Sequence, residues 1–355
     1  MNKLKVGIIG CGFISGAHMR GWTNIEDTEI TAVCDVDVSK AEMRAKEYSI
    51  NKVFTDYKEM LEKEKFDIVD VITPVKSHRD IVIAAAEHKN HVLCEKPFAE
   101  NMEDGIEMVR VCGKAGSCLM ICQTNRWHPW FRTIKQELEK GTIGAPYYSV
   151  ISQRVSFAIP QGPEGKVALV EDQPFYESVG RLVLLEQGCH FVDIFRFFFG
   201  DAISVSAVVK KISPYVIGDD LAIVVIEFPQ LTAVLEDSWV SSGSEKTSVT
   251  LVEGNRGSLY FDGTSGAAPH RTIEVGGVEV RLRNGKVTSI PQDAKEYYVR
   301  SFEYIERHFI DCIKNDKEPI TSGRDNLRSL DIIFSAYWSS DIKRTVYLGE
   351  GKSNS

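Results

Sequence analysis

The first 124 residues alternate short apolar runs with amphipathic stretches, and this alternation restricts the fold more than any other feature. The apolar runs are rich in Val and Ile and are bounded by Gly, Pro, Asp or Asn, which is typical of strands: residues 4–10, 29–35, 53–55, 67–74, 91–96 and 118–123. Helical stretches lie between them, at residues 38–48, 57–65, 78–88 and 102–116. The alternation predicts a doubly wound α/β domain, a parallel sheet covered on both faces with its ligand site at the carboxyl ends of the strands.

After about residue 126 the pattern changes. One helix is expected at 131–140, followed by β-rich runs with turn sequences between them, which predict antiparallel hairpins: residues 202–212, 221–228, 231–240 and 247–254. Two helices, at 299–315 and 326–343, close the chain. A length of 355 residues suits two domains. We predict a doubly wound domain over residues 1–124 and a second, β-rich domain over residues 125–355.

The charge balance argues against two classes of partner. A formal net charge of −8 does not suit a global basic field for nucleic acid or for an anionic membrane. No apolar run approaches the roughly 20 residues that span a bilayer, and the apolar N-terminus leads directly into a glycine turn, as a strand does. Most of the eight cysteines sit in apolar runs without a CxxC pair, so we expect buried, reduced thiols and a cytoplasmic protein.

A glycine-containing turn, Gly10-Cys11-Gly12-Phe13-Ile14-Ser15, directly follows the first strand and opens a helix. Glycine lets the backbone approach a pyrophosphate, and the N–H groups at a helix N-terminus attract its charge. The third glycine of the usual dinucleotide motif is replaced by Ser15, a residue small enough for close packing of helix against strand. The turn therefore predicts dinucleotide binding.

Asp35 ends the second strand, 25 residues after Gly10. A carboxylate at this point accepts hydrogen bonds from the ribose hydroxyls of the cofactor and repels a 2′-phosphate. Val36 follows, and no Arg comes immediately after it, although Lys40 is close. The sequence thus favours NAD over NADP.

A longer motif covers residues 73–97. It contains Thr73-Pro74, His78, Ala84–Ala86, His91-Val92 and Glu95-Lys96-Pro97. With the glycine turn, it resembles the Gfo/Idh/MocA oxidoreductase family, and the similarity continues through residues 123–129, 141–146, 184–200 and 321–330. The resemblance implies a Rossmann domain followed by an α/β domain with a large open, mostly antiparallel sheet. It also implies NAD(P)-dependent hydride transfer to or from a hydroxyl of a sugar, polyol or related compound, and association into a homodimer or homotetramer.

The turn and the resemblance together suggest which residues contact the cofactor. They are Gly10, Gly12, Phe13, Ile14, Asp35, Val36, Thr73, Pro74, His78, Glu95, Lys96 and Asn125.

Lys96 is the expected acid/base of the reaction. It stands at a strand's carboxyl end, between Glu95 and Pro97, close to where the cofactor is expected. Partial desolvation and a neighbouring cation lower a lysine's pKa and make it a usable acid or base. In the family the peptide bond before this proline is often cis, so we expect a cis bond between Lys96 and Pro97.

Glu186 and His190 form the second expected catalytic element. At a spacing of four residues on a helix they would share one face. The family pattern has Asp at the first position, and the Glu leaves two roles open for Glu186, a substrate hydrogen bond or orientation of His190. Asp193, three residues after His190, is expected to support packing. These three side chains could contribute to a metal site, but no further ligand is visible, and we expect none.

Further substrate contacts are expected from Arg126, Trp127 and Tyr176, besides Lys96 and His190. Arg126 and Trp127 follow the last strand of the first domain, and packing between domains is the alternative role for both. Tyr176 lies in a long Pro-, Gly- and acid-rich stretch, residues 158–179, which is typical of a lid or an oligomer arm.

The prediction is therefore an NAD-dependent dehydrogenase that acts on a sugar, polyol or related hydroxy compound. Two other classes known among relatives stay open: a glycosidase that uses the nicotinamide as a redox centre, and a non-catalytic dinucleotide sensor. Which hydroxy compound is bound depends on loop side chains that the sequence does not identify.

Overall fold

The computed structural model describes residues 3–160, 165, 167, 176, 178–242, 248–263 and 276–349. The chain divides into two compact units, the first made of residues 1–127 and 296–330 and the second of residues 128–295 and 331–355. Much of the predicted loop at 158–179, together with residues 264–275 and 350–355, lies outside the described residues.

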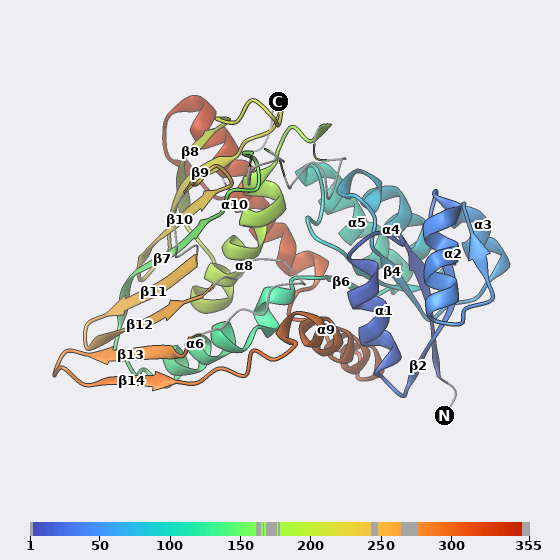
Figure 1. Ribbon diagram of the computed structural model, residues 1–355, viewed down its shortest axis with the longest axis horizontal. Helices are drawn as coiled ribbons and strands as arrows, with labels where there is room; N and C mark the ends of the chain where they lie inside the picture. The colour runs from blue at the N-terminus through green and yellow to red at the C-terminus, as the bar shows by residue number, and fades with distance from the viewer. Residues whose placement is uncertain are drawn as a thin grey trace. The chain divides into compact units, whose positions relative to one another are not determined.

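The first unit contains a six-stranded parallel sheet in the order β3-β2-β1-β4-β5-β6 (Figure 1). The strands are β1 Leu4–Ile9, β2 Thr28–Cys34, β3 Val53–Phe54, β4 Ile68–Val71, β5 His91–Cys94 and β6 Leu119–Ile121. The strand order reverses between β1 and β4, and a ligand of such a sheet binds beyond the carboxyl ends of the strands at this point. The predicted doubly wound domain is confirmed.

Helices connect these strands, and their ends follow local sequence signals. They are α1 Ser15–Thr23, α2 Val38–Glu47, α3 Tyr57–Lys63, α4 His78–Glu87 and α5 Met102–Ala115, with short 3₁₀ turns η1 Val75–Ser77 and η2 Thr124–Trp127. Asp37, Asp56 and Asn101 cap α2, α3 and α5 by accepting backbone N–H groups. Gly116 ends α5 in the left-handed conformation that glycine adopts at low cost.

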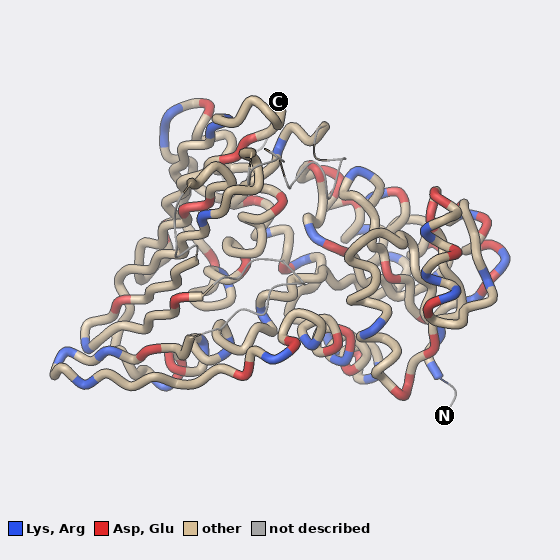
Figure 2. The backbone as a smooth tube through the Cα atoms, in the orientation of Figure 1, with Lys and Arg blue, Asp and Glu red and all other residues tan. Residues whose placement is uncertain are grey.

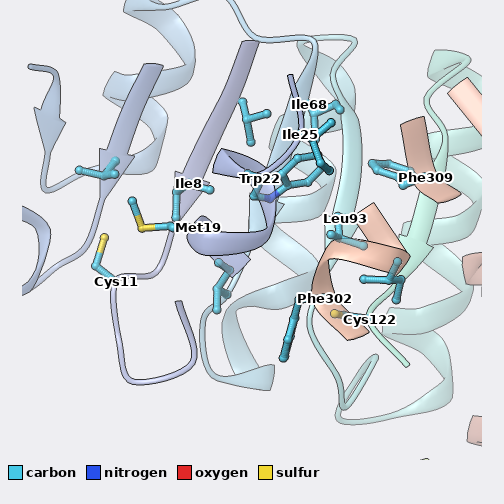
Figure 3. Close-up of a cluster of buried hydrophobic side chains, with 14 of the residues drawn as sticks. Ile8, Cys11, Met19, Trp22, Ile25, Ile68, Leu93, Cys122, Phe302 and Phe309 are labelled. Atoms are coloured by element: carbon cyan, nitrogen blue, oxygen red, sulfur yellow. The ribbon is translucent and has the colours of Figure 1, made fainter. Parts of the chain in front are cut away.

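Helix α9, Tyr297–Lys314, also belongs to the first unit. Its Phe302 and Phe309 share a buried cluster with Met19 and Trp22 of α1 (Figure 3). The structure thus differs from the predicted division, which placed all residues after 124 in the second domain. The reason is that the apolar face of α9 is buried against α1, and the sequence does not reveal which sheet an amphipathic helix covers.

The second unit is built on a nine-stranded sheet in the order β14-β13-β12-β11-β7-β10-β9-β8-β15. The strands are β7 Pro146–Arg154, β8 Ser204–Lys210, β9 Leu221–Glu227, β10 Thr232–Ser238, β11 Ser248–Gly254, β12 Gly257–Asp262, β13 Val278–Leu282, β14 Val287–Ile290 and β15 Val346–Tyr347. Strands β7 and β10 run parallel, and the other neighbouring pairs run antiparallel. The expected large, mostly antiparallel sheet is confirmed.

Side chains alternate across this sheet, as expected where one face is packed and the other is open. Ala222, Val224 and Ile226 of β9 are fully buried, whereas Ile223 between them is exposed. The helical segments in the described part of this unit include α6 Pro129–Glu139, the π-helical turn η4 Val183–Gln187, α8 Gly188–Phe199 and the last part of α10 Gly323–Ile342. Helix α8 packs on β10, and this packing forms the core of the unit.

The charged residues are spread over both units (Figure 2), and the cysteines form no disulfide bonds. Acidic and basic residues are interspersed along both units (Figure 2). Among the described residues, no helix is long and apolar enough to cross a membrane. All eight cysteines are free, as predicted, and all are buried except the half-buried Cys118.

Candidate functional site

The glycine turn has the geometry of a phosphate-binding loop. Gly10 has a φ of +103°, and a Cβ atom on it would lie 2.3 Å from the carbonyl oxygen of Ile72, so glycine is required there. A Cβ atom on Gly12 would have nothing within 4 Å of it, which leaves open space for a close ligand. Among the described residues, no side chain caps the N-terminus of α1, so its first N–H groups are available to an anion.

Ser15 and Arg44 explain the departure from the usual third glycine. The Ser15 hydroxyl donates to the carbonyl of Gly12 (2.6 Å) and accepts from Arg44 Nε (3.0 Å). Arg44 Nη2 also donates to the carbonyls of Gly12 (3.2 Å) and Phe13 (3.3 Å). A Cβ atom on Gly16 would lie 3.0 Å from Arg44 Nη1, so a glycine at this position leaves room for the guanidinium. Arg44 therefore holds the turn in shape.

Asp35 follows β2 and is turned toward the glycine turn. Its two carboxylate oxygens accept the N–H groups of Cys11 (2.7 Å) and Asp37 (2.9 Å). These bonds fix a negative charge beside the turn, where the sequence predicted the cofactor-selecting residue. Val36, the next residue, is 93% exposed.

His78 ties together two loops at the carboxyl edge of the sheet. Its ring is fully buried, with Nε2 2.8 Å from the carbonyl oxygen of Thr73 and Nδ1 3.0 Å from that of Pro97. The loop after β4, which contains Pro74, is thereby joined to the loop after β5. This bonding accounts for the burial of His78, and a direct contact with a cofactor stays a prediction.

Lys96 lies directly after β5 in one of these two loops. Its side chain is half-buried, its bond to Pro97 is cis as expected, and its backbone N–H donates to Glu95 Oε2 (2.9 Å). The Glu95 side chain turns inward, where Oε1 contacts His18 Nε2 at 2.9 Å. Lys96 and the glycine turn thus stand at the same edge of one sheet, while Glu95 is occupied in the core beneath them.

Asn125, Arg126 and Trp127 form the 3₁₀ turn η2 and are buried. Arg126 donates to the carbonyl of Ile320 (2.7 Å) and to Asp325 (2.8 Å), and Trp127 belongs to the buried cluster of the first unit. These contacts give both side chains a structural role within their own unit. Their contact with a substrate stays a prediction.

Glu186 and His190 belong to the second unit, and their local structure corrects an expectation. The sequence predicts one α-helix, but Glu186 lies in the π-helical turn η4 and His190 lies in α8. A π turn bonds i to i+5 and changes the angular offset between neighbouring turns, so the simple four-residue rule does not apply. Such turns are frequent at functional sites.

Asp219 fixes the start of this π turn. Its oxygens accept the N–H groups of Leu182 (2.8 Å) and Leu184 (3.0 Å), and Tyr337 donates its hydroxyl to Oδ1 (3.0 Å). Burial raises the pKa of Asp219, and these hydrogen bonds partly oppose that shift. A Cβ atom on Gly218 would lie 2.5 Å from the carbonyl oxygen of Val179, so the chain passes closely here. The position of Glu186 thus depends on a buried carboxylate.

Tyr176 is the expected substrate contact that the structure brings to Glu186. Its hydroxyl lies 3.5 Å from Glu186 Oε2, and both side chains are buried. The Tyr176 ring meets the Trp239 ring edge-on at 6.0 Å, and Trp239 donates its indole N–H to Gln187. His190 is half-buried, whereas Asp193 is fully buried in the packing of α8.

Comparisons with known proteins match both parts of the chain. Residues 4–123 match a family model described as an oxidoreductase family with an NAD-binding Rossmann fold. Residues 131–260 match the model of the GFO/IDH/MocA C-terminal domain. The chain belongs to the Gfo/Idh/MocA oxidoreductase family.

Relatives extend over nearly the whole chain. A D-apiose dehydrogenase from Paraburkholderia graminis is 32% identical, with 98% of this chain and 90% of that protein covered. A myo-inositol 2-dehydrogenase from Thermotoga maritima is 26% identical, with 98% and 99% covered. A crystal structure of an oxidoreductase from Agrobacterium radiobacter, in complex with NAD⁺, L-tartaric acid and magnesium, has a TM-score of 0.86 at 28% identity and covers 98% of this chain and 99% of its own.

The matching family model describes an NAD-binding Rossmann fold, and the residues of the first unit fit NAD. Gly12 leaves room for a pyrophosphate, the uncapped start of α1 offers N–H groups to it, and Asp35 offers a carboxylate to ribose hydroxyls. These features are on one edge of one sheet, and they suit the pyrophosphate and the ribose of the family's cofactor.

Sequence reasoning missed three side chains of the first unit: Arg44, which holds the glycine turn, and His18 and Asp70 in the core beneath it. Only Asp70 had a visible signal, because it is a lone charge in the middle of the apolar run of β4 and is fully buried. His18 and Arg44 lie on helices, where polar residues are common, so their contacts depend on how α1 and α2 pack.

Proposed function

We propose that this protein is an NAD-dependent dehydrogenase that oxidises a CH–OH group of a sugar, polyol or related hydroxy compound, with Lys96 as the acid/base. The observation that supports it best is the place of Lys96. It is half-buried at the carboxyl end of β5, on the same edge of the sheet as the glycine turn. Its backbone is held by Glu95, and its loop is tied to the neighbouring loop by His78.

The chemistry assigns a separate task to each group. In the oxidation, the neutral amine of Lys96 takes the hydroxyl proton of the substrate, and the C–H bond of the same carbon breaks with its electron pair. NAD, when bound, supplies the acceptor for that hydride. In the reverse direction protonated Lys96 returns the proton to the oxygen.

In the second unit we propose that His190 binds or deprotonates a substrate hydroxyl and that Glu186 and Tyr176 support it. Glu186 keeps a carboxylate where the family pattern has Asp, one methylene further from the backbone. The contact of Tyr176 with Glu186 restricts that longer side chain. Tyr176 acts through this contact.

We propose NAD as the preferred cofactor over NADP. Asp35 keeps its carboxylate beside the glycine turn through two backbone N–H bonds, and this charge repels a 2′-phosphate. Lys40, the base that could favour NADP, has an exposed side chain with Asp37 3.9 Å away.

For the substrate we propose a monosaccharide or a cyclic polyol. The support comes from the relatives, which are named as dehydrogenases of D-apiose and of inositols. Among them the two D-apiose dehydrogenases, at 32% and 30% identity, make D-apiose the first compound to test.

The test is a turnover assay with NAD or NADP and a panel of D-apiose, myo-inositol, scyllo-inositol and common aldoses, followed by NADH absorbance at 340 nm. We expect Lys96→Ala to lose at least about 10²-fold in kcat and to keep NADH binding. Lys63→Ala is the matched control, because Lys63 is an exposed lysine of the same unit that pairs with Glu59. Full turnover of Lys96→Ala contradicts the proposal. Glycoside cleavage without NADH formation would select the glycosidase alternative, and binding without turnover the sensor.

We also propose a homodimer or homotetramer formed through the open face of the large sheet. Val208 of β8 and Ile223 of β9 are register partners, and both are exposed on that face. Exposed apolar side chains side by side on a sheet favour a second copy as partner. Light scattering on the protein leaving a sizing column tests this, with Val208→Lys/Ile223→Lys expected to give monomers.

A further inference from the structure

Four polar side chains lie in the core of the first unit, and none of them exchanges a proton with the substrate in the proposed reaction. His18 comes from α1, Asp70 from β4, Glu95 from the end of β5 and Glu306 from α9. The first, second and fourth are 0% exposed, and Glu95 is 7% exposed. Burial of polar groups is costly unless they are paired, so we ask how these four side chains are paired.

The contacts of His18 determine its protonation state. Nδ1 lies 2.9 Å from Asp70 Oδ2 and Nε2 lies 2.9 Å from Glu95 Oε1, and Trp22 donates its indole N–H to the same Asp70 oxygen (2.7 Å). Ionised carboxylates only accept, so with both acids ionised the two ring nitrogens donate and the ring is an imidazolium. Burial alone would lower the pKa of His18, but the charges and hydrogen bonds of Asp70 and Glu95 raise it to about 10.

The same contacts lead to the backbone of Lys96. Glu95 bonds His18 through Oε1 and the N–H of Lys96 through Oε2. A continuous chain of hydrogen bonds therefore runs from Asp70 in the core, through His18 and Glu95, to the peptide group of Lys96. The His18 ring is also packed against the Phe302 ring at 4.6 Å, and Figure 3 shows Phe302 and Trp22 within this core.

We propose that His18 is a positioning residue for Lys96: its imidazolium, anchored on Asp70, orients the Glu95 carboxylate that holds the Lys96 backbone. The inference rests on the proposed role of Lys96 as the acid/base. His18 touches neither substrate nor cofactor in this role, and it acts only through Glu95. Its cation also offsets one of the two negative charges that the buried carboxylates carry.

Three other titratable groups face this chain: Cys122, directly after β6, and Tyr298 and Glu306 of α9. Cys122 Sγ lies 4.0 Å from His18 Nε2, and nitrogen or oxygen atoms of His18, Asp70 and Glu306 all lie within 4.8 Å of one another. Burial raises the pKa of each of the three groups, which keeps Cys122 and Tyr298 neutral at pH 7 and favours the neutral form of the Glu306 carboxyl. The Glu306 carboxyl fits against Gly21, where a Cβ atom would lie 2.2 Å from Oε2. Asp70 and Glu95 thus remain the carboxylates that determine the charge of His18.

The first test reads the protonation state of His18 directly. In full-length protein with ¹⁵N-labelled histidine, we expect both ring nitrogens of His18 to be protonated from pH 6 to pH 9, with the signal assigned by its loss in His18→Gln. Asp70→Asn should move the titration of His18 to lower pH. A neutral ring at pH 7.5 in the unmodified protein overturns the proposal, and this measurement does not depend on turnover.

The second test is a double-mutant cycle on turnover. We expect His18→Gln and Glu95→Gln each to lower kcat by about 10- to 100-fold, with KM for NAD changed by less than about 3-fold. The kcat of the double variant should be no lower than that of the worse single variant. The two Gln amides of the double variant can bond each other, whereas His18→Gln alone leaves the charge of the Glu95 carboxylate without its cation. Losses that multiply, or a His18→Gln variant with unchanged kcat, overturn the proposal.

Two controls separate this inference from the proposed function. His91→Gln removes a half-buried histidine from the opposite end of β5, where its ring accepts the Cys118 N–H, and should leave kcat unchanged. Loss of turnover in Lys96→Ala together with unchanged kcat in His18→Gln overturns only the positioning role. Full turnover of Lys96→Ala overturns the proposed role of Lys96 and, with it, this inference.

Discussion

Lys96 in the first unit and Glu186 in the second are both held by a buried carboxylate that accepts backbone N–H groups. Glu95 accepts the N–H of Lys96 and is paired with the His18 cation. Asp219 accepts two N–H groups and a phenol hydroxyl, all of them neutral donors. The first support relies on charge compensation in the core, and the second on the number of hydrogen bonds.

This difference has consequences for pH. Burial raises the pKa of Asp219. On acidification, Asp219 is therefore protonated, and its hydrogen bonds to the π turn are weakened, at a higher pH than for an ordinary carboxylate. The His18 support instead weakens on the alkaline side, as pH approaches the pKa of about 10. We call the surroundings of Lys96 and the glycine turn the first region, and those of Glu186 and His190 the second region. Variants of the two regions can therefore be told apart by turnover, by cofactor preference and by the pH dependence of stability.

His190→Ala removes the imidazole that we propose binds or deprotonates a substrate hydroxyl in the second region. We expect kcat/KM for the substrate to fall by about 10²- to 10⁴-fold, since a positioned acid or base contributes that much, and Glu186→Gln to lose about 10-fold. Steady-state kinetics with NADH detection measures both. His88→Ala, an exposed histidine that follows α4 and bonds the Ala84 carbonyl, is the control. An activity of His190→Ala within about 3-fold of the unmodified protein would remove this region from the reaction.

The neutral support of Glu186 is broken in Asp219→Ala. We expect kcat to fall about 10- to 100-fold and the free energy of unfolding to fall by about 2 kcal/mol, because two backbone N–H groups lose their acceptor. Asp220 is a matched control, since it also is buried and accepts two N–H groups, those of Ile212 (2.7 Å) and Ser213 (2.6 Å). Asp220→Ala should lose similar stability in denaturant titrations and keep kcat. Equal losses of kcat in both variants would speak for a general effect of destabilisation.

The cofactor edge of the first region is altered in Asp35→Ser. We expect the ratio of kcat/KM for NADP to that for NAD to rise about 10-fold or more, because the charge that repels a 2′-phosphate is gone. Asp37→Ser is the control, since Asp37 in the same loop caps α2 and Ser is also a preferred N-cap residue, so neither the stability nor the ratio should change much. An unchanged ratio in Asp35→Ser would assign cofactor choice to other side chains.

The charged support of the first region is visible in the pH dependence of stability. His18 binds its proton more tightly in the folded protein, with a pKa of about 10, than in the unfolded chain, so its contribution is complete below about pH 6.5 and is lost as pH rises toward 10. Between pH 7 and 9, the unfolding free energy of the unmodified protein should therefore fall more steeply than that of His18→Gln, by up to about 1.4 kcal/mol per pH unit. Urea titrations at several pH values measure this, and parallel curves would contradict a protonated His18.

Much of the first region was predictable because its signals are local. The glycine turn, the acid after β2 and the loop of Lys96 each depend on a few consecutive residues at strand ends, and the strand and helix periods place them at one edge of a parallel sheet. In the second region the local rule failed at Glu186. A π turn differs from an α-helix by one extra residue, and here it is stabilised by Asp219, more than 30 residues away in sequence.

Periodicity and the types of neighbouring residues were enough to predict the doubly wound sheet, the glycine turn and the acid beside it. Three features depend instead on how distant segments pack: α9 lies on α1, Arg44 holds the turn, and His18 joins Asp70 to Glu95. His18 and Glu95 are 77 residues apart in sequence. Their contact exists because helix packing brings them together in a core where each needs the other as a partner.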